Sequence, residues 1–134
     1  MVEVKVQVEA EIYPSESEEK VRAAVTNILA NASIKITPSG KTDTLTAEAK
    51  GQDSLLKLRS ILCNDRIRDA SRKALFRSLR GNTISFCLNK QVAFAGHISF
   101  SEETAESPLG PLRVTIETDS PQQLIEWLAE KTER

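Results

Sequence analysis

Four basic side chains near the middle of the chain have the types and spacing expected of a phosphate-binding surface. Stepping 100° per residue around a helix places all four within an arc of roughly 60°. They are Arg66, Lys73, Arg77 and Arg80. Lysines and arginines held on a rigid element can neutralise the phosphates of a nucleic acid and release its counterions. The alternative is a solvated helix face with cations favoured near a C-terminus by the helix dipole. Asp69 is the only acid between Arg66 and Arg80, which favours anion binding over a salt-bridged exterior.

Basic and acidic residues are distributed unevenly along the chain. Residues 53–90 contain nine lysines and arginines and three aspartates, a net charge of +6. Residues 1–52 contain six basic and eight acidic residues, and residues 91–134 contain three and eight. The overall formal charge of −1 therefore hides a basic centre between two acidic ends.

Three further residues lie beside the four cations in the same helical projection. Arg68 and Arg72 fall at the edge of the apolar stripe, so we expect both to be partly buried and paired, with an acid of the sheet as one candidate partner. Phe76 falls between the cations, where it could stack on a nucleobase. Packing of Phe76 under another loop is the alternative.

Hydrophobic periodicity predicts the elements that position these residues. Apolar and polar residues alternate over 2–12, which is typical of a strand with one solvated face. A helix capped by Ser15 or Ser17 follows, and two short strands flank the turn at 38–40. The core side of this helix is expected to be Val21, Ala24, Val25, Ile28 and Leu29.

The central helical stretch begins near Asp53 and is expected to end at Gly81, the usual glycine position after a helix C-terminus. Three leucines share its core side at helical spacing, namely Leu55, Leu58 and Leu62. Asn64 could end one helix and cap another, so residues 53–80 are compatible with one long helix or two.

The last third of the chain is predicted to be mostly strand. Residues 83–88 alternate, and the apolar alternation from Val92 to Phe100 predicts a hairpin that turns at Asn89-Lys90. A further strand over 112–116 precedes a helix that starts at Ser120-Pro121. The sequence thus predicts a single α+β domain over 1–134, with a mixed, mainly antiparallel sheet and helices packed on one face.

The strand over 2–12 also bears on assembly. It is long and lies at the chain terminus, so we expect it at a sheet edge, where unpaired strands invite pairing with another chain. This predicts a homodimer. The alternative is that Glu3, Glu9 and Glu11 keep the edge monomeric by their charge.

Several classes of chemistry find no support in the residues. His97 is the only histidine, and Cys63 and Cys87 are not spaced as metal ligands. The two cysteines are interpreted as buried free thiols, with a disulfide between them as the alternative. The glycines form no phosphate-binding loop and no nucleophile motif. We therefore expect no enzyme, no metal and no cofactor. No apolar run approaches the roughly 18 residues of a membrane span, which favours a cytoplasmic protein without a membrane partner.

An ordered set of short motifs runs along most of the chain: Arg66-Ile67-Arg68-Asp69-x-x-Arg72, Gly81-Asn82, Leu88-Asn89-Lys90-Gln91, Ala95-Gly96, Pro108-Leu109-Gly110-Pro111 and Trp127-Leu128. In this order they resemble an uncharacterised archaeal protein family that is labelled RNA-binding. The fold of that family is likened to the ribosomal protein that binds 5S RNA. The resemblance implies an α+β domain in an archaeal cytoplasm, and a homodimer.

The resemblance draws attention to Asn89, Lys90 and Gln91. A polar triplet at a hairpin tip would offer amide donors and acceptors and one cation to phosphates or base edges. The alternative is a well-made turn, in which asparagine serves the backbone.

The resulting hypothesis is a non-catalytic RNA-binding protein that holds phosphates on the basic helix face, with Lys90 nearby. Specificity would come from Asn89, Gln91 or Phe76. The alternative is a structural or assembly protein that docks its basic central helix on an acidic protein partner. A pI near 5.9 supports this alternative, because nucleic-acid-binding domains are more often basic.

Overall fold

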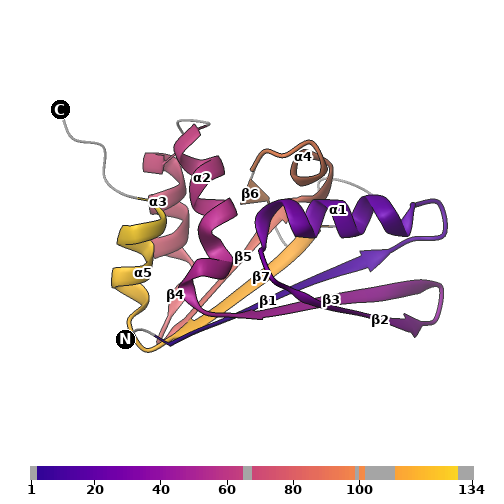
Figure 1. Cartoon of the computed structure of the whole chain (residues 1–134), viewed down its shortest axis with the longest axis horizontal. Helices are drawn as coiled ribbons and strands as arrows, with labels where there is room; N and C mark the ends of the chain where they lie inside the picture. The colour runs from indigo at the N-terminus through magenta and orange to yellow at the C-terminus, as the bar shows by residue number, and fades with distance from the viewer. Residues whose placement is uncertain (1–2, 65–67, 99, 102–110, 130–134) are drawn as a thin grey trace.

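A computed structural model describes residues 3–64, 68–98, 100–101 and 111–129 of the chain. Its elements, in chain order, are β1 (Val4–Ile12), α1 (Glu18–Ile28), β2 (Ser33–Ser39), β3 (Thr42–Lys50), a 3₁₀ turn η1 (Gln52–Leu55), α2 (Leu56–Asn64), α3 (Arg68–Arg77), β4 (Leu79–Arg80), β5 (Thr83–Asn89), α4 (Lys90–Phe94), β6 (Phe100–Ser101), β7 (Pro111–Thr118) and α5 (Pro121–Leu128). The helices lie on one side of a twisted sheet (Figure 1). The predicted α+β class with helices on one face is confirmed.

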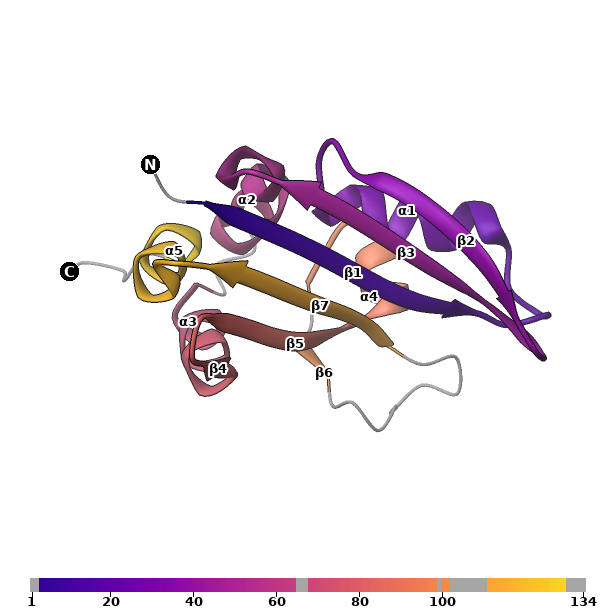
Figure 2. The ribbon, with the colours of Figure 1, turned by 90° about the horizontal axis from the view of Figure 1, so that it is seen from below.

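The sheet has the strand order β2-β3-β1-β7-β5-β4, and β6 also pairs with β5. Every strand pair in the described part of the chain is antiparallel. Figure 2 shows the strands side by side with the helices behind them, so one face of the sheet is left uncovered. The alternation predicted for β1 is confirmed, because Val4, Val6 and Val8 are buried while Lys5 and Gln7 are exposed.

The predicted edge position of β1 is wrong. β1 pairs with β3 on one side and with β7 on the other, so it lies in the middle of the sheet. Both neighbours carry a matching apolar face, and a strand at the chain terminus is as free to insert between them as any other. The homodimer stays a prediction that rests on the family resemblance alone.

The first helix and the hairpin after it follow their sequence signals. Ser17 occupies the N-cap of α1, and the five apolar residues predicted for its core side are all buried. β2 and β3 pair around Gly40, whose φ of +69° suits a residue without a Cβ atom. Both elements are therefore confirmed.

The central stretch forms two helical segments, α2 and α3, and residues 65–67 between them lie outside the described residues. The three predicted leucines are buried, Leu55 in η1 and Leu58 and Leu62 in α2, together with Leu75 of α3. The expected helix end at Gly81 is wrong. α3 ends at Arg77, and Leu79 and Arg80 pair with Ile84 and Thr83 as strand β4. Gly81, at φ +60°, instead forms the tight turn of that hairpin.

The hairpin predicted at Asn89-Lys90 is also wrong, because residues 90–94 form the short helix α4. The Asn89 side chain explains the change. Its Oδ1 accepts a hydrogen bond from the backbone N–H of Val92 at 3.0 Å, which is the bond of a helix N-cap. Val92 and Phe94, predicted to lie on a strand face, therefore lie in a helix, and Phe94 is left exposed.

The C-terminal elements are confirmed. Leu112, Val114 and Ile116 of β7 are buried, and Ser120 occupies the N-cap position of α5, with Pro121 in the first turn. α5 lies beside α3 over one end of the sheet (Figure 1). No helix in the described ranges is long and apolar enough to cross a membrane.

The two cysteines are free, but the predicted burial is wrong for Cys63, which is exposed, and incomplete for Cys87, which is half-buried. Cys63 follows the buried Leu62 by one residue, and a 100° step carries its side chain off the core side of α2. The thiol of Cys87 alternates with Phe86 and Leu88 and so lies on the uncovered face of the sheet.

Candidate nucleic-acid interface

Three of the predicted phosphate-binding residues gather at the end of α3 and on the strand that follows it. Lys73 and Arg77 stand one turn apart on α3, and both are exposed. Arg80 is exposed on β4, and its Nη1 donates hydrogen bonds to the carbonyl oxygens of Arg77 at 3.0 Å and Leu79 at 2.8 Å. We call these three residues the α3–β4 basic cluster.

The structure corrects how Arg80 joins this group. The helical projection placed it on the same helix face as Lys73, but the helix has ended at Arg77 and the chain has turned into β4. Arg80 is held beside Arg77 by its own hydrogen bond to the helix C-terminus, where the dipole favours a cation. Within the described ranges, no ion pair joins any of the three cations to an acid. Their charges are therefore available to an anionic partner.

The other predicted members of the basic surface cannot be placed in the same way. Arg66 lies outside the described residues, so its place in the phosphate-binding face stays a prediction. Arg68 is the first residue of α3, but its side chain is not among those that the structure describes.

Arg72 differs from its neighbours because it is paired. Both terminal nitrogens of its guanidinium donate to the carboxylate of Glu126 on α5, and the side chain is 24% exposed. The hydrogen bonds to Glu126 raise the pKa of Arg72 above its ordinary value. Partial burial and pairing are as predicted, but the acid belongs to a helix and not to the sheet. Arg72 fastens α3 to α5.

Phe76 packs inward. It is partly buried against the hydrophobic core, and the guanidinium carbon of Arg72 lies 5.1 Å from the centre of its ring. This arrangement matches the alternative in which Phe76 packs within the fold, although its partner is an arginine and not a loop. Stacking of Phe76 on a nucleobase would require it to leave these contacts.

The predicted polar triplet is divided by the structure. Asn89 caps α4 with its side chain, and the side chain of Gln91 lies outside the described residues. Lys90 is buried, with 5% of its side chain exposed. Its ammonium donates to the carbonyl oxygen of Glu11 at 2.7 Å and to the two carboxylate oxygens of Glu16 at 3.0 and 3.2 Å. Lys90 thus joins α4 to the turn between β1 and α1, and the expectation that it binds phosphate is not supported.

Lys90 is also far from the basic cluster. Arg80 pairs with Thr83 at one end of β5, whereas Lys90 follows Asn89 at the other end. Six strand residues at about 3.3 Å each separate them, a distance of roughly 20 Å. The prediction that Lys90 lies near the other cations is therefore wrong.

A cavity of about 360 Å³ opens beside Lys90 and is called the α4 pocket below. Its described lining includes Ser15, Glu16, Ser17, Lys20, Lys90 and Phe94. Lys20, on α1, and Phe94 were not predicted as site residues, and Phe94 was predicted to lie on a strand. The signal in the sequence that favours a helix at Phe94 is Asn89, whose side chain caps α4.

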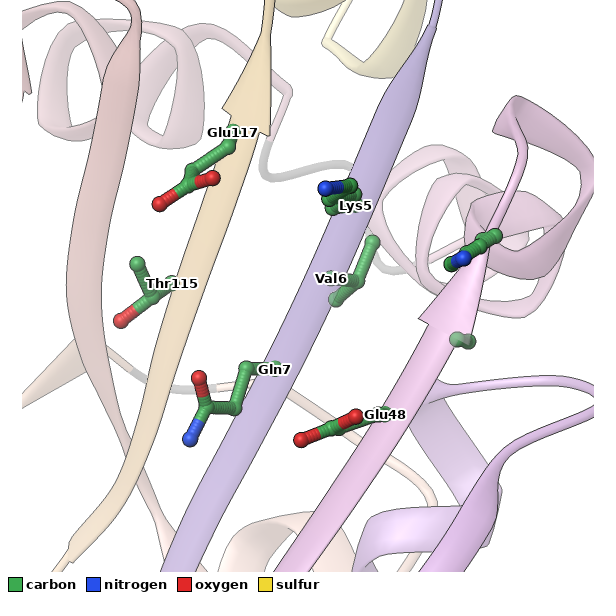
Figure 3. A pocket seen from close by; sticks show the side chains of 8 residues that line it. Lys5, Val6, Gln7, Glu48, Thr115 and Glu117 are labelled. Atoms are coloured by element: carbon green, nitrogen blue, oxygen red, sulfur yellow. The ribbon is translucent and has the colours of Figure 1, made fainter.

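The uncovered face of the sheet is polar and carries balanced charge. Figure 3 shows Lys5, Gln7, Glu48, Thr115 and Glu117 projecting from β1, β3 and β7 around a shallow hollow of about 190 Å³. Across β1, β2, β3 and β7 this face carries four basic and four acidic side chains, by alternation with the buried residues: Lys5, Lys35, Lys50 and Arg113, and Glu9, Glu11, Glu48 and Glu117. By the same alternation Arg80 of β4, a member of the α3–β4 basic cluster, lies at one edge of this face. The part of the face formed by these four strands has no net charge and no general attraction for phosphates, so the α3–β4 basic cluster is the better candidate.

Comparison with known proteins gives the chain its family. Residues 5–118 match a family model described as RNA binding. A UPF0201 protein of Sulfurisphaera tokodaii is 48% identical over 128 residues, which cover 96% of this chain and 88% of the relative. A UPF0201 protein of Sulfolobus acidocaldarius is 44% identical over 128 residues, with the same coverage of 96% and 88%.

A solved structure agrees with the fold. The crystal structure of a UPF0201 protein from Methanococcus jannaschii has a TM-score of 0.84 at 26% identity, covering 96% of this chain and 95% of that one. The expected likeness to the ribosomal protein that binds 5S RNA is not confirmed by these matches. The chain therefore belongs to the archaeal UPF0201 family and to the family whose model is described as RNA binding.

Proposed function

We propose that this protein is a non-catalytic RNA-binding protein that holds RNA phosphates with the α3–β4 basic cluster. The observation that carries the proposal is that Lys73, Arg77 and Arg80 are exposed cations with no ion pair to a described acid. The family description supports RNA as the anion. Arg66 is expected to add a fourth phosphate contact.

The cluster is suited to phosphates more than to bases. Its three side chains are cations on the rigid junction between a helix and a strand, and contacts to phosphate position an RNA without reading its sequence. Asn89, once expected to read base edges, uses its carbonyl oxygen to cap α4. Gln91 keeps its proposed role in specificity. We therefore expect the α3–β4 basic cluster to bind RNAs of different sequence with similar affinity.

The alternative function is docking on an acidic protein, which the pI near 5.9 favours. The two functions differ in their response to salt. Release of condensed counterions from RNA makes log affinity fall linearly with log salt concentration. Four phosphate contacts predict a slope of roughly −3, at about 0.7 to 0.9 per contact. An acidic protein surface has no condensed counterions of this density.

Fluorescence anisotropy of a labelled structured RNA, titrated with the protein at four salt concentrations, tests the proposal. We expect binding at low salt and the steep slope given above. Absorbance at 260 and 280 nm during purification at low salt provides a second test, since one tryptophan and one tyrosine make bound RNA easy to detect. A protein that purifies without RNA and fails to bind structured RNA at low salt would contradict the proposal.

A further inference from the structure

The α4 pocket has the size of a ligand site. Its volume of about 360 Å³ falls within the range of roughly 300–1,000 Å³ typical of small-molecule sites. It lies between the turn that follows β1 and the short helix α4, roughly 20 Å along β5 from the α3–β4 basic cluster. The pocket is thus separate from the proposed phosphate-binding surface.

The aromatic wall of the pocket is held on a fixed backbone. Asn27 of α1 donates from its Nδ2 to the carbonyl oxygens of Ala93 at 2.9 Å and Phe94 at 3.1 Å. The other end of α4 is capped by Asn89. Despite these restraints the Phe94 side chain is 45% exposed, one of two large apolar side chains exposed in the described chain. The fold therefore fixes this segment without burying its ring.

The charges around Phe94 suit an anion. Lys90 and Glu16 form a buried ion pair and neutralise one another, with side chains 5% and 9% exposed. Lys20 is exposed, and its ammonium lies 5.8 Å from the centre of the Phe94 ring. The described lining, with two lysines and one glutamate, has a net charge of +1. Ser17, at the N-cap of α1, makes no capping hydrogen bond with its side chain, so its hydroxyl can also serve a ligand.

We infer that the α4 pocket binds one unpaired nucleotide, with the base stacked on Phe94 and the phosphate held by the ammonium of Lys20. Stacking on an aromatic ring and pairing with a cation are the two contacts by which proteins hold single-stranded nucleotides. The lysine side chain is long and exposed, so its ammonium can move from the ring to a phosphate while the backbone stays in place. The nucleotide can be a free mononucleotide or an unpaired nucleotide of an RNA. In the second case the inference extends the RNA-binding proposal by a second contact.

The test uses the full chain labelled with ¹⁵N and ¹³C, titrated with four probes and followed by NMR. The probes are adenosine 5′-monophosphate, adenosine, inorganic phosphate and a six-nucleotide single-stranded RNA. We expect the monophosphate or the RNA to shift the ring signals of Phe94 and the amide signals of Ser17 and Lys20. Phe94→Ala should weaken binding roughly 5- to 150-fold, the loss expected for one base–aromatic stack. Lys20→Gln should weaken the monophosphate but not adenosine.

Matched controls separate this site from the general surface. Leu56→Ala removes the other exposed large apolar side chain, and Lys35→Gln removes an exposed lysine from the uncovered sheet face; neither should change affinity. Urea unfolding checks that Phe94→Ala and Lys20→Gln remain folded.

The outcomes distinguish the two sources of the nucleotide and the two proposals. Binding of the monophosphate supports a free nucleotide, and binding of the RNA alone supports an unpaired RNA nucleotide. If the monophosphate binds through Phe94 while structured RNA fails to bind, this inference stands and the RNA-binding proposal falls. If neither nucleotide probe shifts Phe94, or if Phe94→Ala binds as tightly as the parent protein, the inference is overturned.

Discussion

Lys90 and the residues of the α3–β4 basic cluster are all basic side chains, but their surroundings are opposite. The ammonium of Lys90 is buried against the carboxylate of Glu16, in the turn after β1, and the carbonyl oxygen of Glu11, near the end of β1. Lys73 and Arg77 are exposed, and no ion pair within the described ranges involves them. Both regions were predicted to bind phosphate, the cluster from the helical spacing of its cations and Lys90 from the family resemblance. The partners of a basic side chain therefore decide its role, and the partners of Lys90 come from a distant segment of the chain.

Lys90→Ala should have the largest effect on stability of the variants proposed here. Removal of the lysine leaves the Glu16 carboxylate buried without its partner, and breaking a buried pair in this way typically costs about 3–5 kcal/mol. Urea unfolding of the variant measures the loss. Where the variant stays folded, its salt slope for RNA should equal that of the parent protein, because Lys90 contacts no phosphate.

Two controls accompany Lys90→Ala. The double variant Lys90→Met with Glu16→Leu removes both charges and should recover much of the lost stability, since a well-packed apolar pair often replaces a buried ion pair without cost. Lys73→Ala removes an exposed lysine and should change stability by at most about 0.5 kcal/mol. A loss below about 1 kcal/mol for Lys90→Ala would show that the pair is solvated like the basic cluster.

Gly81→Ala, in the turn that positions Arg80, should have the next largest effect on stability. Gly81 has a φ of +60°, and this left-handed conformation costs a residue with a Cβ atom roughly 1–2 kcal/mol. No atom lies within 4 Å of the added Cβ, so the cost is conformational and not a clash. Urea unfolding should show this loss. RNA affinity should also fall, because strain in the turn is relieved most easily by moving β4.

Gly40→Ala is the matched control for Gly81→Ala. It has a similar φ of +69° and equally open surroundings, but it lies in the β2–β3 turn, away from the basic cluster. It should lower stability by a similar amount and leave RNA affinity unchanged. Equal losses of RNA affinity in both variants would mean that Arg80 has no special place in binding.

The elements that could be predicted from the sequence are those whose pattern is local. Alternation alone predicted that the residues of β1 and β7 form strands, and a serine followed by proline predicted where α5 starts along the chain. These patterns report one solvated side and one buried side, which each segment carries regardless of its neighbours. The buried residues of α1 were predicted for the same reason.

The parts that could not be predicted depend on long-range contacts or on a single side-chain bond. The central position of β1 requires β7, more than a hundred residues later in the chain. The helix α4 depends on the Asn89 cap, which competes with an equally plausible strand alternation. The burial of Lys90 depends on Glu16, 74 residues away. The same limit applies to the candidate site, where the exposed cations were recognised but the pocket around Phe94 was not.

Arg77→Gln should change stability least, and it is the sharpest test of the α3–β4 basic cluster. Loss of one phosphate contact should lower the magnitude of the salt slope by roughly 0.7 to 0.9 and weaken RNAs of different sequence alike. Stability should change by at most about 0.5 kcal/mol, because the side chain is exposed.

Arg72→Gln, on the same helix, is the matched control. It removes the pair with Glu126, so it should lower the urea midpoint and change the salt slope less. Anisotropy titrations at several salt concentrations and urea unfolding of both variants give the two measurements. If Arg77→Gln leaves the salt slope unchanged, Arg77 is solvated and binds no phosphate, and the contrast with Lys90 reduces to a difference in burial.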